Sequence, residues 1–111
     1  MTRIADLSMR LDVHRPVWSE DGAGGETVSY QIAGALWGAV MVRGMAERYA
    51  DERLDGIVTH RIRLRHGSGI VGEIAGGWRL VSGVRVFRVL VAAPVEDGGQ
   101  WLDALCEEEG R

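Results

Sequence analysis

The chain has 111 residues, 46% hydrophobic and 26% charged, as expected for one globular domain over residues 1–111. Its formal net charge is −3, with 13 arginines, no lysine and 16 acidic residues, so no overall positive field attracts nucleic acid. Cys106 is the one cysteine, which excludes an internal disulfide and a cysteine-based zinc cluster and favours a reducing compartment.

The first predicted element is a strand that ends at Pro16. Its apolar side chains, Leu11 and Val13 among them, alternate with polar ones, which is the period of a half-buried strand. Residues 17–26 are rich in turn formers and predict a mobile loop. Trp18 lies in this loop, where local packing and a protein interface are equally good interpretations.

Residues 27–42 predict a second long strand, or two strands that meet at residues 33–34. Both of its faces are apolar, with Leu36 on one and Trp37 on the other. Such a strand is either enclosed in a core or covered by another subunit. The uncharged run is 16 residues long, shorter than the ~20 that a membrane span needs, so we expect a soluble chain without a membrane partner.

Residues 42–56 depart from this β character. Residues 44–55 are rich in Ala, Glu, Arg and Met, which are good helix formers. Their apolar side chains are too scattered to form one buried helical face. We interpret the segment as an excursion between the second and third strands, either a short helix or a long loop.

The third predicted strand, residues 56–66, carries a stripe of three arginines on one face. Arg61, Arg63 and Arg65 alternate with an apolar face that also holds His60. Three like charges repel unless water, acids or phosphates lie against them. The stripe is therefore either solvated or part of an interface. For His60 we favour a hydrogen-bonded core position over a metal site, because no second histidine stands at ligand spacing.

Three more strands complete the prediction. Residues 78–82 and 84–92 flank a tight turn at Ser82-Gly83, and residues 100–107 form the last strand before an acidic tail over residues 107–111. Cys106 lies on an apolar strand face, which favours a buried, inert thiol. The pattern predicts a mainly β chain, a small antiparallel β-barrel of about six strands. No catalytic motif or metal-ligand spacing is present, so we expect no enzyme activity, cofactor or metal.

The chain resembles the phage head–tail joining, or head-completion (stopper), proteins along nearly its whole length. The ordered features are a short strand ending in RP, a Gly-rich loop, ALWGAV, THRIRLRH, GVRVFRVL and the terminal WLDALCEE. Phe87 stands where the typical form has tyrosine. The resemblance implies a small β-barrel that assembles into a ring, typically of twelve subunits, in the neck of a tailed phage or a gene transfer agent.

In such particles the ring would contact the portal or adaptor ring on one side and tail terminator or tail tube proteins on the other. It would seal the packaged double-stranded DNA, with residues 42–56 closing the axial channel, after assembly in the bacterial cytoplasm. We therefore expect a loop that faces DNA, with Arg43, Arg48, Tyr49 and Arg53. The residues expected at subunit or ring interfaces are Trp18, Trp37, Arg61, Arg63, Arg65, Glu107 and Glu108, the arginines meeting a neighbour's glutamates.

Two alternatives stay open on the sequence. A tail terminator or another neck-ring protein would belong to the same assembly. A small barrel that binds single-stranded nucleic acid, through the arginine stripe and loop aromatics, belongs to a different functional class.

Overall fold

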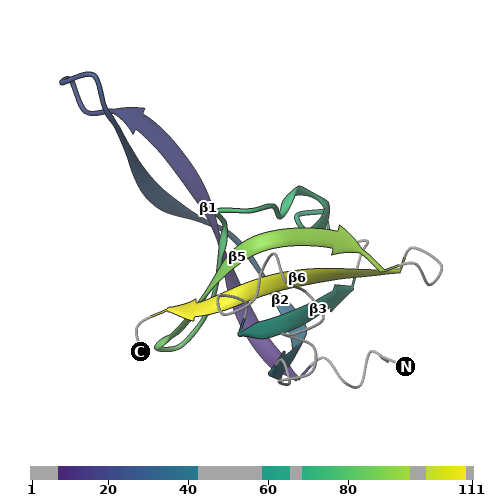
Figure 1. Ribbon diagram of the computed structural model, residues 1–111. Helices are drawn as coiled ribbons and strands as arrows, with labels where there is room; N and C mark the ends of the chain where they lie inside the picture. Colours follow the sequence, from purple (N-terminus) through teal and green to yellow (C-terminus); the bar gives the residue numbers. More distant parts are fainter. Residues whose placement is uncertain (1–7, 43–58, 66–68, 96–99, 110–111) are drawn as a thin grey trace.

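The computed structural model describes residues 8–42, 59–65, 69–95 and 100–109, and it is built almost entirely of strands (Figure 1). Mainly β structure with about six antiparallel strands was predicted, and the structure confirms it. The elements are β1 (Met9–Glu20), β2 (Glu26–Val42), β3 (His60–Arg65), the short 3₁₀ helix η2 (Val71–Glu73), β4 (Arg79–Ser82), β5 (Arg85–Pro94) and β6 (Trp101–Glu109). No helix within these ranges is long and apolar enough to cross a membrane.

The six strands close into a barrel in the order β1-β2-β3-β6-β5-β4, and every neighbouring pair is antiparallel. Closure depends on a short ladder between β1 and β4, in which Asp12, Val13 and His14 pair with Val81, Leu80 and Arg79. In the barrel, each strand therefore has a hydrogen-bonded neighbour on both sides, which removes open sheet edges.

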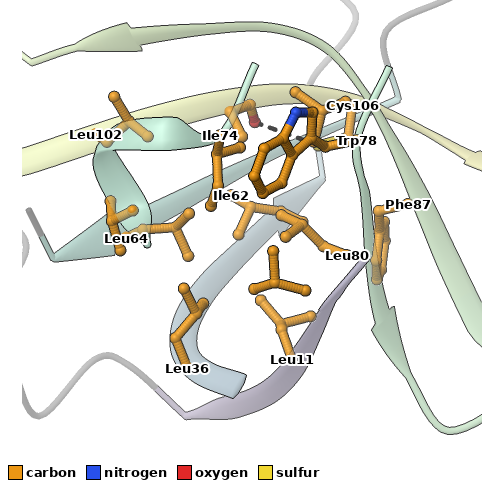
Figure 2. Close-up of a cluster of buried hydrophobic side chains, with 14 residues drawn as sticks. Leu11, Leu36, Ile62, Leu64, Ile74, Trp78, Leu80, Phe87, Leu102 and Cys106 are labelled. Atoms are coloured by element: carbon orange, nitrogen blue, oxygen red, sulfur yellow. Dashed lines mark hydrogen bonds between the residues drawn. The ribbon is translucent and has the colours of Figure 1, made fainter. Parts of the chain in front are cut away.

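One continuous hydrophobic core fills the barrel (Figure 2). It follows from the alternation of each strand: Leu11 and Val13 of β1 point inward, as do Ile62 and Leu64 of β3. The other large side chains with almost no exposed surface are Leu80, Phe87, Val71 and Val89. His60 and Cys106 also lie inside, as predicted.

Beyond the barrel, β1 and β2 continue as a two-stranded hairpin, which we call the arm (residues 15–31). In Figure 1 the arm extends well away from the other strands, and the molecule measures 49 × 32 × 27 Å. The register of β1 and β2 shifts between Val13 and His14, so Ala33 is the extra residue of a β-bulge. The bulge lies where the β1–β4 ladder ends, at the root of the arm.

Two predicted boundaries are wrong. The first strand does not stop at Pro16: β1 runs to Glu20 and β2 begins at Glu26, so half of the predicted loop over residues 17–26 is strand. Pro16 is tolerated because the outer edge of β1 is unpaired at that point. The predicted acidic tail is also strand as far as Glu109, because β6 pairs with β5 up to that residue. The excursion over residues 42–56 lies, apart from Val42, outside the described residues.

The predicted turn between the fourth and fifth strands is confirmed, one residue further along. Ser82 pairs with Arg85 across a two-residue loop of Gly83 and Val84. Gly83 has φ +60°, a conformation that glycine adopts without steric cost, as the first position of a type II′ turn requires.

Gly38 is packed so tightly that a methyl group there would not fit. A Cβ atom at this position would lie 2.9 Å from Leu11 Cδ1, 3.0 Å from Leu64 Cδ2 and 3.1 Å from Ile62 Cγ2. We expect Gly38→Ala to lower the free energy of unfolding by about 1–3 kcal/mol through overpacking. Gly34→Ala is the matched control, because its Cβ would meet only Ile70 at 3.5 Å, an ordinary contact. Urea unfolding that ranks the two variants equally would contradict this prediction.

Candidate interaction surface

The outward face of β2 is apolar along almost its whole length, from the arm to the barrel. Leu36 and Gly38 point into the core, so Trp37 between them points outward. The bulge at Ala33 keeps Ile32 on the same outer face, opposite His14. We call this face the β2 outer stripe; it consists of Val28, Tyr30, Ile32, Ala35, Trp37, Ala39 and Met41.

Much of the β2 outer stripe is open to solvent in the isolated chain. Ile32 is 73% exposed and Trp37 54% exposed. Trp18 of β1 pairs with Val28 and is 62% exposed, so it extends the stripe toward the end of the arm. Trp18 and Trp37, both expected at interfaces, therefore share one face, and their interface role stays a prediction. Large, contiguous apolar surface of this kind is typical of protein contact sites.

The opposite face of the arm is polar. Ser19 and Thr27 lie directly across from each other, with their hydroxyl oxygens 3.2 Å apart, and the Ser29 hydroxyl donates to the Val17 carbonyl at 3.5 Å. The root of this face is fixed by Arg15, which donates to Glu73 at 3.1 Å and lies over the Trp78 ring. The arm is thus amphipathic, although it has no core of its own.

The arginine stripe of β3 is not a row of equivalent charges. Arg63 donates two hydrogen bonds to Asp103 of β6, Nε to Oδ1 at 2.7 Å and Nη2 to Oδ2 at 2.9 Å. Both side chains are 19% exposed, so this bidentate pair is half buried on the barrel wall. Arg61 contacts the Met41 sulfur at 4.0 Å, whereas Arg65 is exposed. The middle of the stripe is therefore neutralised within the chain.

The glutamates expected to meet a neighbour's arginines have partners in their own chain. Alternation splits them: Glu108 points inward at one end of the barrel, while Glu107 and Glu109 point outward. Arg85 donates to both carboxylate oxygens of Glu108, at 3.0 and 3.1 Å, and this hydrogen bond raises the pKa of the Arg85 guanidinium. Arg88 contacts Glu107 at 2.7 Å and Glu109 at 3.6 Å.

These ion pairs were not predicted, because they depend on the strand order. Arg79 of β4 contacts Glu109 at 3.2 Å and also lies over the Tyr30 ring, 4.1 Å from its centroid. This cation–π contact joins the arm to the barrel. The amino-acid sequence showed only the alternation of side chains along β5 and β6, and this alternation does not determine which strands are neighbours.

His60 occupies the core position that was predicted. Its ring meets the Phe87 ring edge-on, with centroids 5.2 Å apart, and its Nδ1 lies 2.8 Å from the Thr59 hydroxyl. Its Nε2 lies 3.7 Å from Glu108. In the part of the chain that the structure describes, no group of three or more His, Cys, Asp or Glu side chains could hold a metal ion.

Cys106 is fully buried, and burial raises the pKa of its thiol to about 12. We expect no reaction with a disulfide reagent at pH 8 in the native protein and full reaction in urea, because the thiolate is the nucleophile. Between about pH 9 and 12 the folded state holds a proton that the unfolded state has lost, so stability falls as pH rises. Cys106→Ala should remove that part of the alkaline destabilisation, as measured by urea unfolding at pH 8 and 10. Rapid native labelling at pH 8 would contradict the prediction.

The four residues expected to face DNA, Arg43, Arg48, Tyr49 and Arg53, lie outside the described residues. Val42, the last described residue before them, is exposed and pairs with His60 at the end of the β2–β3 ladder. β2 therefore ends, and β3 begins, at the same end of the barrel.

Comparisons with known proteins agree on one family and one fold. The sequence profile of the phage head completion proteins matches residues 2–109. The solution structure of protein SF1141 from Shigella flexneri 2a superposes with a TM-score of 0.74 at 19% identity, over 99% of both chains. A chain in the virion of a native gene transfer agent particle superposes with a TM-score of 0.65 at 24% identity, over 93% of this chain and 96% of that one. Comparison with curated protein sequences gave no significant match.

Proposed function

This chain belongs to the phage head completion protein family, and we propose that it is a structural ring subunit that completes the head of a phage or a gene transfer agent. In this role it seals the packaged DNA and provides the surface on which the tail docks. The ring function is mechanical and requires no catalysis. The similarity of the fold to a chain in a gene transfer agent virion supports a place in such a particle.

The observation that carries this proposal is the β2 outer stripe. In an isolated small barrel the core covers only the inner face of a strand, so an apolar outer face stays exposed to water. The exposed side chains of Trp18, Ile32 and Trp37 therefore favour association with another protein surface. A ring subunit uses unlike patches on its two sides, and each copy repeats the same contact until the ring closes. Strands that are apolar inside and outside are expected of such a subunit.

The finer features of the role follow from the resemblance described above. We propose twelve subunits in the neck, assembled in the bacterial cytoplasm, with the portal or adaptor ring on one side and tail terminator or tail tube proteins on the other. Residues 42–56, with Arg43, Arg48, Tyr49 and Arg53, would face the packaged double-stranded DNA in the channel. A tail terminator is the alternative within the same assembly.

A role in binding single-stranded nucleic acid is less well supported. Phosphate binding needs cations that are not already neutralised, and Arg63, at the centre of the stripe, has a bidentate carboxylate partner in Asp103. A filter-binding titration of the free subunit at low and high salt separates the functions. Tight binding that weakens strongly with salt would favour the nucleic-acid function over the structural one.

The decisive experiment is deletion of this protein from the particle. We expect particles without it to lose packaged DNA or to fail to join tails, and negative-stain images of purified protein with portal–adaptor complexes to show an added ring. DNA content can be measured as the fraction protected from nuclease. Full heads that join tails normally without the protein would contradict the proposed function.

A further inference from the structure

The end of the arm concentrates negative charge. Glu20 and Glu26 face each other directly across the hairpin, and Asp21 follows in the loop between them. Like charges in directly opposed positions destabilise a strand pair. Residues 16–42 contain no arginine or lysine, and no ion pair to Glu20 or Glu26 occurs among the described residues. We call Glu20, Asp21 and Glu26 the acidic tip.

The shape of the acidic tip suits a cationic side chain. A hollow of about 250 Å³ lies there, lined by Glu20, Gly22, Gly24, Gly25 and Glu26. The loop around it is held in place because Asp21 Oδ1 accepts hydrogen bonds from the backbone N–H groups of Ala23 at 2.8 Å and Gly25 at 3.0 Å. The Asp21 carboxylate is thus already used within the loop, whereas the glutamates on either side remain available.

A complementary surface lies on the barrel, at the other end of the β2 outer stripe. Arg10 pairs directly with Trp37 on the outer face. Leu64 pairs with Gly38, so the next residue, Arg65, lies on the other side of Trp37. Arg10 and Arg65 are exposed, and neither has an ion-pair partner among residues 8–42, 59–65, 69–95 and 100–109. We call Arg10, Trp37 and Arg65 the basic–aromatic patch.

The two surfaces cannot meet within one molecule. Glu20 lies ten residues after Arg10 on the same extended strand, a separation of about 34 Å at ~3.4 Å per residue. In Figure 1 the arm points away from the barrel, so it does not fold back on it. A contact between the two surfaces therefore needs two copies of the chain.

We propose that the acidic tip of one subunit docks on the basic–aromatic patch of a second copy. Arg10 and Arg65 would bind the carboxylates of Glu20 and Glu26, and the apolar face of the arm near Trp18 would cover Trp37. A guanidinium binds a carboxylate through two parallel hydrogen bonds, which fixes the orientation as well as the affinity. Each copy carries one tip and one patch, so in the proposed ring every tip binds the patch of the next copy, and the contact repeats from head to tail until the ring closes.

This inference rests on the proposed ring and identifies its lateral contact. It replaces the pairing expected between the β3 arginines and a neighbour's Glu107 and Glu108, which have arginine partners in their own chain. It also explains why the arm carries an apolar face without a core beneath it. A two-stranded hairpin is only marginally stable alone, and a neighbouring subunit would cover this one.

Cysteine cross-linking in assembled particles tests the contact directly. Ala23 lies at the tip and Ala35 on the β2 outer stripe beside Trp37, and both are exposed. The native Cys106 is buried and does not compete. We expect particles that carry Ala23→Cys and Ala35→Cys in the same chain to give, after oxidation, a ladder of multiples on a non-reducing gel. Each single variant should stay monomeric. The absence of a ladder, or dimers from Ala23→Cys alone, would overturn the proposal.

Charge reversal provides the second test. Its outcomes distinguish a failure of the docking contact from a failure of the proposed function. We expect Glu20→Arg/Glu26→Arg and Arg10→Glu/Arg65→Glu each to lower incorporation into particles at least tenfold. All four substitutions together should restore it, because the complementarity is regained in the opposite sense. Glu107→Gln is the control that removes a carboxylate outside both surfaces, one whose Arg88 partner lies in its own chain. Circular dichroism of each free variant would confirm that it folds.

The outcomes identify which idea fails. If the wild-type protein is in the particle and is needed for DNA retention, but both reversals incorporate normally, the docking contact is wrong and the proposed function stands. If the protein is not needed for DNA retention or tail joining, the proposed function is wrong. If only the Arg10 and Arg65 reversal has an effect, and the tip reversal has none, the patch contacts another partner, such as DNA phosphate, and the docking contact is again wrong.

Discussion

Replacing Phe87 with alanine is expected to lower the free energy of unfolding by about 3–5 kcal/mol, the usual cost of removing a fully buried aromatic ring. Phe87 has no exposed surface, and it is paired with Leu80 on the neighbouring strand β4. The His60 ring meets it edge-on and the Arg85 guanidinium lies 4.9 Å from its centroid, so both would lose a packing partner. A domain of this size has a total stability on the order of 5–15 kcal/mol.

Urea unfolding followed by tryptophan fluorescence would measure this loss. Val84→Ala is the matched control, because Val84 lies in the β4–β5 turn of the same hairpin and is 95% exposed. We expect the control to change stability by less than about 0.5 kcal/mol. Phe87→Tyr is a useful third variant, since the added hydroxyl needs a hydrogen-bond partner in the core. Equal stabilities of Phe87→Ala and Val84→Ala would show that the ring is not part of the core.

The second large effect is expected at Asp103. Asp103→Ala leaves the half-buried Arg63 guanidinium without the carboxylate that accepts its two hydrogen bonds, at 2.7 and 2.9 Å. Both side chains are 19% exposed, so solvent compensates part of the loss, and we expect about 1–3 kcal/mol of destabilisation. The measurement is again urea unfolding, at low and at high salt.

Two comparisons separate this effect from a general loss of charge. Glu73→Ala removes the Arg15 pair, whose side chains are 41% and 57% exposed, and should cost less than about 1 kcal/mol. Arg63→Leu combined with Asp103→Leu should recover part of the stability lost in Asp103→Ala, since both members of the bidentate pair are then replaced together by apolar side chains. A double variant as unstable as Asp103→Ala would contradict the explanation that the loss of stability in Asp103→Ala comes from the Arg63 charge without its carboxylate.

The candidate surface was only partly predictable. Trp18 and Trp37 were expected at interfaces because they are large aromatic residues. The structure places both on one exposed face, which their positions in the sequence did not predict. Trp37 faces outward because Leu36 and Gly38 face the core, and the bulge at Ala33 extends that face into the arm. A one-residue insertion of this kind reverses the alternation. The possible break at residues 33–34 was noted, but not that one continuous strand passes through it as a bulge.

The amino-acid sequence by itself determined the class of the fold: alternating β-branched and aromatic residues with frequent turn formers specify short antiparallel strands, and His60 and Cys106 were assigned to the core by their position in that alternation. These features are local, with a period of two residues. Only the tertiary structure decided which strands are neighbours, and hence that Asp103 pairs with Arg63 and Glu108 with Arg85. It also decided that residues 17–20 are strand rather than loop, because pairing with β2 continues beyond the barrel. Strand order depends on contacts between residues far apart in the chain, and local periodicity does not encode them.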